Sequence, residues 1–334
     1  MAAFGQSATG GVNGTVTDTT GGVIPDVTLT LTNQGTGIAA TAATNASGVY
    51  AFVSVAPGPY TLKAEKSGFK TAQVPTFVVN VNQTLTQDIV LAVGDVSQTI
   101  EVRAEAPLLQ ASTSELGTVI GQQAVERLPL NGRNFTQLLL LTPGVAPVNT
   151  AQEWGSTVAL PGSTWVKPAV NGQWNRSNMY LMDGVINTEQ ETSGYNVLPS
   201  LDAIQEFKVQ SHNDKAEYGM VMGGTVNLVT RSGTNTLRGS VFEFLRNEVF
   251  NARDPFTDIV PVDEEQPEKG LKGPATFRQN QFGATLGGPV YIPRVYDGRE
   301  KTFFFGSYDG WRYRLARKAL YRVPTAEELS GDFS

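Results

Sequence analysis

Cysteine is absent from all 334 residues, which excludes disulfides, thiolate metal sites and cysteine nucleophiles. Histidine occurs once, as His212, and no G-x-S-x-G motif accompanies it, so a Ser-His-Asp hydrolase is disfavoured. A G-x-x-x-x-G-K-[ST] phosphate loop is also missing. Because these signatures are lacking, we predict that the protein is not an enzyme and has no cofactor.

Long apolar runs and an excess of positive charge are lacking as well. The longest candidate for a membrane helix is Leu138–Leu141, far short of the roughly 18 residues that a helix needs, although a β-barrel wall needs no such run. The net charge of -6 offers no basic field for nucleic acid. Asp258 and the run Asp263–Glu265 lack the spacing of a calcium loop, and we interpret them as solvated.

Glycine and proline are plentiful, at 35 and 18 residues, and they separate short alternating segments. In residues 11–93, apolar side chains alternate with threonine over positions 27–32, and Tyr50 and Tyr60 fall at inward positions. About seven short strands at this spacing predict a β-sandwich. Sugar binding is disfavoured there, because residues 1–100 have no tryptophan and both tyrosines are expected to point inward.

Residues 111–235 have a mixed α/β character. Apolar residues at helical spacing predict helices over residues 122–128 and 135–141, the second ended by Pro143 and Gly144. The pair Asp183-Gly184 is typical of a tight hairpin turn. Strands are expected at residues 179–182, 207–210 and 225–230.

Residues 236–334 combine alternating, aromatic-rich strands with connections of very unequal length. A polar stretch at residues 247–276 follows the first strand, whereas a short turn at Asp297-Gly298 precedes the third, aromatic one. Long and short connections in alternation are typical of an outer-membrane β-barrel. The alternative is a soluble β-domain with one disordered insertion.

Three stretches carry a resemblance to a known family. The segment "GTVTDTTGGVIPDVTLTLTN" with "TNASGVYAFVSVAPGPYTLKAEKSGFK", the segments "RLPLNGRNFTQLLLLTPGV" and "NGQWNRSNMYLMDGV", and the strands "FRQNQFGATLGGPVYIP" and "DGREKTFFFGSYDGWR" resemble TonB-dependent outer-membrane receptors of the Oar-like type. The resemblance implies a mainly β protein. Its expected parts are a transthyretin/Ig-like sandwich of the carboxypeptidase-regulatory-like type, an α/β plug domain, and the first strands of a transmembrane β-barrel of roughly 22 strands.

The family also implies domain boundaries and partners. We expect an export-signal remnant or disordered tail at residues 1–10, the sandwich at 11–93, a linker at 94–110, the plug at 111–235 and about three barrel strands at 236–334, so that the chain is the N-terminal part of a longer receptor. The implied function is import of a large or scarce ligand across the outer membrane, with the sandwich in the periplasm. The implied partners are TonB with its inner-membrane energising complex, outer-membrane lipid and an unidentified imported ligand, and no nucleic acid is expected.

The segment before the plug is the predicted contact for TonB. Its alternating residues resemble a TonB box, whose backbone could add as a strand to a sheet of TonB, and Pro107 would end the pairing. The same residues could instead form the last strand of the sandwich or the first strand of the plug. The predicted box comprises Gln98, Thr99, Ile100, Glu101, Val102, Arg103 and Ala104.

Tryptophans concentrate in the predicted plug. Trp154, Trp165 and Trp174, with Arg176 nearby, are predicted to face the ligand, although packing against the barrel wall would use the same residues. The alternative function is that of a secreted binding or adhesion module, a β-sandwich with an accessory domain that binds carbohydrate or peptide.

Overall fold

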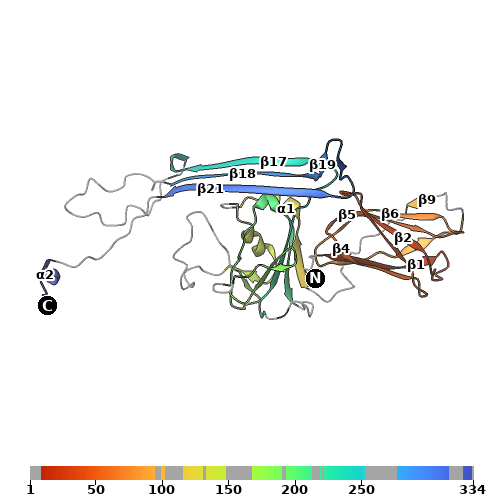
Figure 1. Cartoon of the computed structure of the whole chain (residues 1–334). Helices are drawn as coiled ribbons and strands as arrows, with labels where there is room; N and C mark the ends of the chain where they lie inside the picture. Colours follow the sequence, from red (N-terminus) through yellow and green to blue (C-terminus); the bar gives the residue numbers. More distant parts are fainter. Residues whose placement is uncertain are drawn as a thin grey trace, which may run out of the picture. The chain divides into compact units, whose positions relative to one another are not determined.

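The structure is a computed structural model. It describes residues 9–94, 99–101, 116–130, 133–147, 168–189, 193–212, 219, 221–250, 252, 277–315 and 326–332. The chain divides into two compact units, residues 1–240 with 285–308 and residues 241–284 with 309–334. Strands make up most of the labelled elements (Figure 1). Within the described ranges, no helix is both long enough and apolar enough to cross a membrane.

The N-terminal module, residues 10–101, is built from two sheets. In the first, β1 is central and pairs with β4 antiparallel and with β7 and β8 in parallel. The second has the order β3-β2-β5-β6-β9. The strands are β1 (Gly10–Asp18), β2 (Thr28–Asn33), β3 (Ala39–Ala43), β4 (Val49–Val55), β5 (Gly58–Glu65), β6 (Thr71–Val79), β7 (Thr84–Thr86), β8 (Ile89–Leu91) and β9 (Thr99–Glu101).

One hydrophobic core joins these two sheets, because each strand sends alternate side chains to the same side. Leu29 and Leu31 of β2 are fully buried, as the alternation predicts, and they share the core with Leu62 of β5. Tyr50 and Tyr60 are also buried, which confirms their predicted inward positions. The Tyr50 hydroxyl donates a hydrogen bond of 2.6 Å to the carbonyl of Gln87, which satisfies its polar end inside the core.

The middle module, residues 116–230, contains a five-stranded sheet of order β10-β15-β16-β13-β14. Its parallel pair is β13 with β16, and β15 pairs antiparallel with both of its neighbours. The elements are β10 (Leu116–Ile120), α1 (Gln122–Arg127), η2 (Phe135–Leu141), β11 (Val145–Ala146), β12 (Ala169–Val170), β13 (Met179–Met182), β14 (Val185–Ile186), η4 (Leu201–Ala203), β15 (Ile204–His212) and β16 (Thr225–Thr230).

The apolar face of this sheet forms a second core with the short helices. Phe207 of β15 and Leu228 of β16 pack in one cluster with Val125 of α1 and Leu139 of η2. The predicted helix over residues 122–128 is confirmed as α1, whereas residues 135–141 form a 3₁₀ helix and not an α-helix. The Asn134 side chain accepts a hydrogen bond from the Thr136 amide at the start of η2, which caps this helical segment.

The C-terminal sheet has the order β17-β18-β21, and its three long strands run side by side (Figure 1). A small hairpin, β19 with β20, lies in the short connection between β18 and β21, close to the predicted turn at Asp297-Gly298. The elements are β17 (Arg238–Asn247), η5 (Glu248–Phe250), β18 (Phe277–Pro289), β19 (Tyr291–Ile292), β20 (Tyr296–Asp297), β21 (Phe303–Leu315) and α2 (Ala326–Leu329).

Candidate functional site

The segment predicted to contact TonB contains the edge strand β9. Residues 99–101 pair in parallel with β6, with Thr99 opposite Thr71 and Glu101 opposite Gln73. This pairing matches the alternative in which the segment is the last strand of the sandwich. Gln98 and the predicted box residues Val102, Arg103 and Ala104 lie outside the described residues. The role of the segment as a TonB box stays a prediction.

The predicted ligand-facing residues are described only in part, since Trp154 and Trp165 lie outside the described ranges. Trp174 is exposed, and the guanidinium carbon of Arg176 lies 5.5 Å from the centre of its ring. The buried amide of Asn178 holds this loop: its Nδ2 donates to the Pro168 carbonyl at 2.7 Å, and its Oδ1 accepts from the Gly224 amide at 3.0 Å. An exposed tryptophan beside a half-buried guanidinium suits a ligand contact, which stays a prediction.

The tight turn predicted at Asp183-Gly184 connects β13 to β14, and both residues have positive φ, at 51° and 80°. The Asp183 carboxylate accepts hydrogen bonds from the amide and the hydroxyl of Thr230, each at 2.8 Å. Asp183 therefore fixes the turn against the end of β16. Its carboxylate has a structural role in the sheet, as the predicted hairpin implies.

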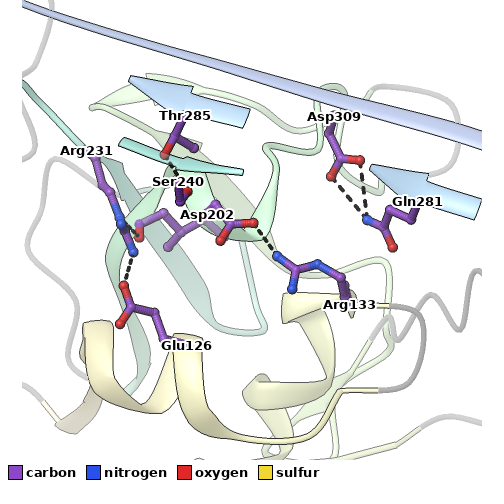
Figure 2. A network of polar contacts seen from close by, with 9 residues as sticks. Glu126, Arg133, Asp202, Arg231, Ser240, Gln281, Thr285 and Asp309 are labelled. Carbon is purple, nitrogen blue, oxygen red and sulfur yellow. Dashed lines mark hydrogen bonds and ion pairs between the residues drawn. The ribbon is translucent and has the colours of Figure 1, made fainter. Parts of the chain in front are cut away.

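Two ion pairs join short helical segments of the middle module to neighbouring parts of the chain (Figure 2). Arg133 pairs with Asp202, and Arg231 donates to Glu126 of α1 at 2.5 Å. Burial acts to raise the pKa of Glu126, but hydrogen bonds from Gln122 and Arg231 outweigh it and lower that pKa overall. The first pair links the segment before η2 to η4, and the second links α1 to the residue that follows β16.

No metal site is formed by the described part of the chain, where no group of three or more His, Asp or Glu side chains is close enough to hold an ion. The acidic residues Asp258 and Asp263–Glu265 fall outside that part. The backbone of His212 pairs with Leu116 at the end of β15.

The C-terminal sheet has an inverted polarity. On β18, Gln279 and Gln281 are almost fully buried, whereas Ala284 and Leu286 are exposed. Two of the buried polar side chains on β18 hydrogen-bond to neighbouring strands: Thr285 Oγ1 lies 2.7 Å from Ser240 Oγ, and Gln281 Nε2 donates to Asp309 at 3.1 Å (Figure 2). Exposed aromatic residues also occur along β21: Phe304, Tyr308, Trp311 and Tyr313.

A soluble sheet buries its apolar face, so this sheet has the opposite arrangement. Apolar side chains outward and polar side chains inward are the pattern of a strand in an outer-membrane barrel, where lipid replaces water on the outside. The sequence shows the alternation along β18, but only the burial reveals which of the two faces is inside.

Comparison with known proteins agrees with this polarity. An outer membrane beta barrel domain model matches residues 229–334, and a carboxypeptidase regulatory-like domain model matches residues 11–92. The TonB-dependent transporter Oar of Myxococcus xanthus is 28% identical to the chain over 325 residues. The chain is a homologue of Oar-type TonB-dependent transporters. Its location is the cell outer membrane, which disfavours the alternative of a secreted module.

The matched region is 92% of this chain but 27% of Oar, so the chain spans about a quarter of the length of that relative. Among solved structures, the siderophore receptor PirA of Acinetobacter baumannii is 23% identical, with a TM-score of 0.37 over 63% of this chain and 26% of that one. The outer membrane transporter YddB of Escherichia coli is 15% identical, with a TM-score of 0.39 over 53% of this chain and 24% of that one.

One polar cluster, on β15, has no counterpart among the sites predicted from the sequence. Polar and apolar residues alternate on this strand, a pattern typical of a strand with one solvent-exposed face. The polar residues are Glu206, Lys208 and Gln210, and the apolar residues are Phe207 and Val209. In the structure, both faces are buried. The alternation could have identified the cluster but not its burial, because the groups that contact it are more than 100 residues away in the sequence.

Proposed function

We propose that the chain is part of an outer-membrane importer, in which residues 11–93 form a periplasmic sandwich, residues 111–235 a plug and residues 236–334 the opening strands of the barrel. The inverted polarity of β18 supports this proposal most directly, since its exposed apolar side is suited to lipid and its polar side to a barrel interior. Homology to Oar, a TonB-dependent transporter, supports the transport role.

The energy for import would come through Gln98–Ala104. TonB would bind this segment by adding it as a strand to its own sheet, so that main-chain hydrogen bonds supply the affinity. In the structure, residues 99–101 use their backbone to pair with β6. Among the described residues, three pairs join β9 to β6, and TonB binding would replace these contacts. TonB binding would thus separate β9 from β6 at the edge of the sandwich.

Ligand binding would involve the tryptophan-rich part of the plug: Trp154, Trp165, Trp174 and Arg176. The exposure of Trp174 and the position of Arg176 over its ring support this assignment. An aromatic face with an adjacent guanidinium can stack on a flat or apolar ligand and attract an anionic group on it.

Capture of the purified periplasmic domain of TonB by the full-length receptor tests the proposal. Ile100→Pro removes a backbone donor and prevents strand pairing, and deletion of residues 98–104 removes the whole segment, so both variants should lose capture. Ile100→Thr is the matched control, because threonine keeps the strand and should retain capture. Equal capture by the receptor and by both disrupted variants would contradict the assignment of the TonB box.

A further inference from the structure

One face of the middle sheet is polar although it is buried. Glu206, Lys208 and Gln210 alternate along β15, and the register places Lys208 opposite Asn227 and Gln210 opposite Thr225 of β16. Directly opposed residues of antiparallel strands point to the same side of a sheet. These five side chains therefore share one face, which we call the polar face, and each of them is at most 5% exposed.

The turn between β6 and β7, residues 80–83, contacts this polar face within the same compact unit. The Val81 amide donates to the Glu206 carboxylate at 2.5 Å, and the Lys208 ammonium donates to the Asn82 carbonyl at 2.6 Å. The Asn82 side chain donates to Gln210 at 3.4 Å. Two backbone groups of the N-terminal module, one amide and one carbonyl, thus bond to two charged side chains of the middle module, a carboxylate and an ammonium.

The turn has the shape that these contacts require. Asn82 has a φ of 49°, a left-handed conformation that asparagine tolerates better than most residues. The side chain of Val81 packs with Val229 at the margin of the polar face, and both are buried. The contact is therefore a small apolar pair beside three polar hydrogen bonds.

A contact of this composition differs from a permanent core. Permanent interfaces are more apolar, whereas carboxylate, ammonium and amide groups are well hydrated when a face is uncovered. Both side-chain polar atoms of Asn227 and the hydroxyl of Thr225 are buried with no hydrogen-bond partner among the described residues. Burial without a partner costs free energy, and water would supply these partners if the face opened.

We propose that the polar face is a releasable docking surface for the β6–β7 turn of the same chain, from which the N-terminal module detaches as a folded unit. The β6 strand is connected to both the TonB-box candidate and the docking turn. Its edge pairs with β9, and its C-terminal end leads into residues 80–83. The docking contacts themselves do not involve β9, so the proposal stands apart from the TonB-box assignment.

Electron spin-label distances in the full-length receptor, reconstituted in lipid nanodiscs, test this proposal. The labels are placed on cysteines introduced at the exposed positions Val90 of β8 and Val185 of β14, within the 334 residues that contain no cysteine. Two variants weaken the docking contact, one in the turn of the N-terminal module and one on the polar face of the middle module. Val81→Asp adds a like charge beside Glu206, and Lys208→Met removes the ammonium while keeping the length of the side chain.

The receptor should give one narrow distance distribution. In the Lys208→Met variant, the ratio of docked to open receptor should fall roughly ten- to a hundredfold, the effect of a lost hydrogen bond to a charged group. Val81→Asp should lower the same ratio through repulsion from Glu206 and loss of the apolar pair with Val229. Both should then show the same broader distribution. Lys63→Met is the matched control, since Lys63 is exposed and pairs with Glu65 on the surface of the N-terminal module, and it should leave the distances unchanged.

Three results would overturn the proposal. A broad distribution in the unaltered receptor would show that the turn does not dock. Unchanged distances in both variants would show that these contacts do not hold the module. Loss of hydrogen-exchange protection in β1, β2 and β5 of the Val81→Asp variant would show that the turn belongs to an obligate core and cannot release as a folded unit.

Discussion

Substitution of Ala284 in β18 gives a sharp test of the membrane-facing side of the C-terminal sheet. Ala284 is exposed, and it is the eighth of the 13 residues of the strand. At about 3.3 Å per residue the strand is about 43 Å long, and a tilt of about 45° reduces its rise to about 30 Å, the thickness of the hydrocarbon core. We therefore expect Ala284 to lie near the middle of the bilayer.

Ala284→Arg should lower the free energy of unfolding by about 2–4 kcal/mol, the cost of arginine on the lipid face at the bilayer midplane. Ala284→Leu, at the same position, should be neutral or stabilising. Val53→Arg is the matched control, because Val53 is exposed on β4 of the N-terminal module, where an arginine in water should change the free energy by no more than about 0.5 kcal/mol.

Equilibrium unfolding of the full-length receptor from phospholipid vesicles, followed by tryptophan fluorescence in a guanidinium series, measures these differences. The reasoning would be refuted if Ala284→Arg were tolerated as well as Val53→Arg, because the exposed face would then be in contact with water. A destabilising effect of Ala284→Leu comparable to that of arginine would also contradict it, since lipid does not penalise an aliphatic side chain.

Three further predictions concern single buried groups. Tyr50→Phe leaves the Gln87 carbonyl without its hydrogen bond, so the opening free energy of β1 and β4 from hydrogen exchange should fall by about 1–3 kcal/mol, and unchanged protection would count against this contact. Asp183→Ala removes both acceptors for Thr230 and strains the turn, so the hydrogen-exchange protection of β13 should fall. Asp183→Gly should recover part of this protection because glycine tolerates the positive φ, and equal losses in the two variants would contradict the backbone contribution. Burial raises the pKa of Glu206 above 4.5, although the hydrogen bond from the Val81 amide acts to lower it, and the Lys208 ammonium is the neighbouring charge on the same face. Docking should therefore be strongest below pH 4.5 and weaken as the pH rises through the raised pKa. Glu206→Gln should remove this pH dependence of the spin-label distances, and a dependence that persists would exclude Glu206 as its source.

Local sequence patterns determined most of the strands. The alternation over residues 27–32 predicted that Leu29 and Leu31 would be buried, and the Asp183-Gly184 pair predicted its turn, because side chains of a strand alternate between faces and few residues adopt positive φ. The resemblance of several motifs predicted the homology to Oar and the outer-membrane location, both of which the comparisons confirm.

Contacts between distant residues decided the rest. The sequence of residues 99–101 is that of a strand, but only the fold makes β6 its partner. The alternation in β18 leaves both faces open as the interior until burial selects the polar one. Glu206 and Lys208 look like the wet side of a strand, yet the turn at Val81 and Asn82 covers them from more than 100 residues away, a proximity that depends on tertiary packing and has no local signal.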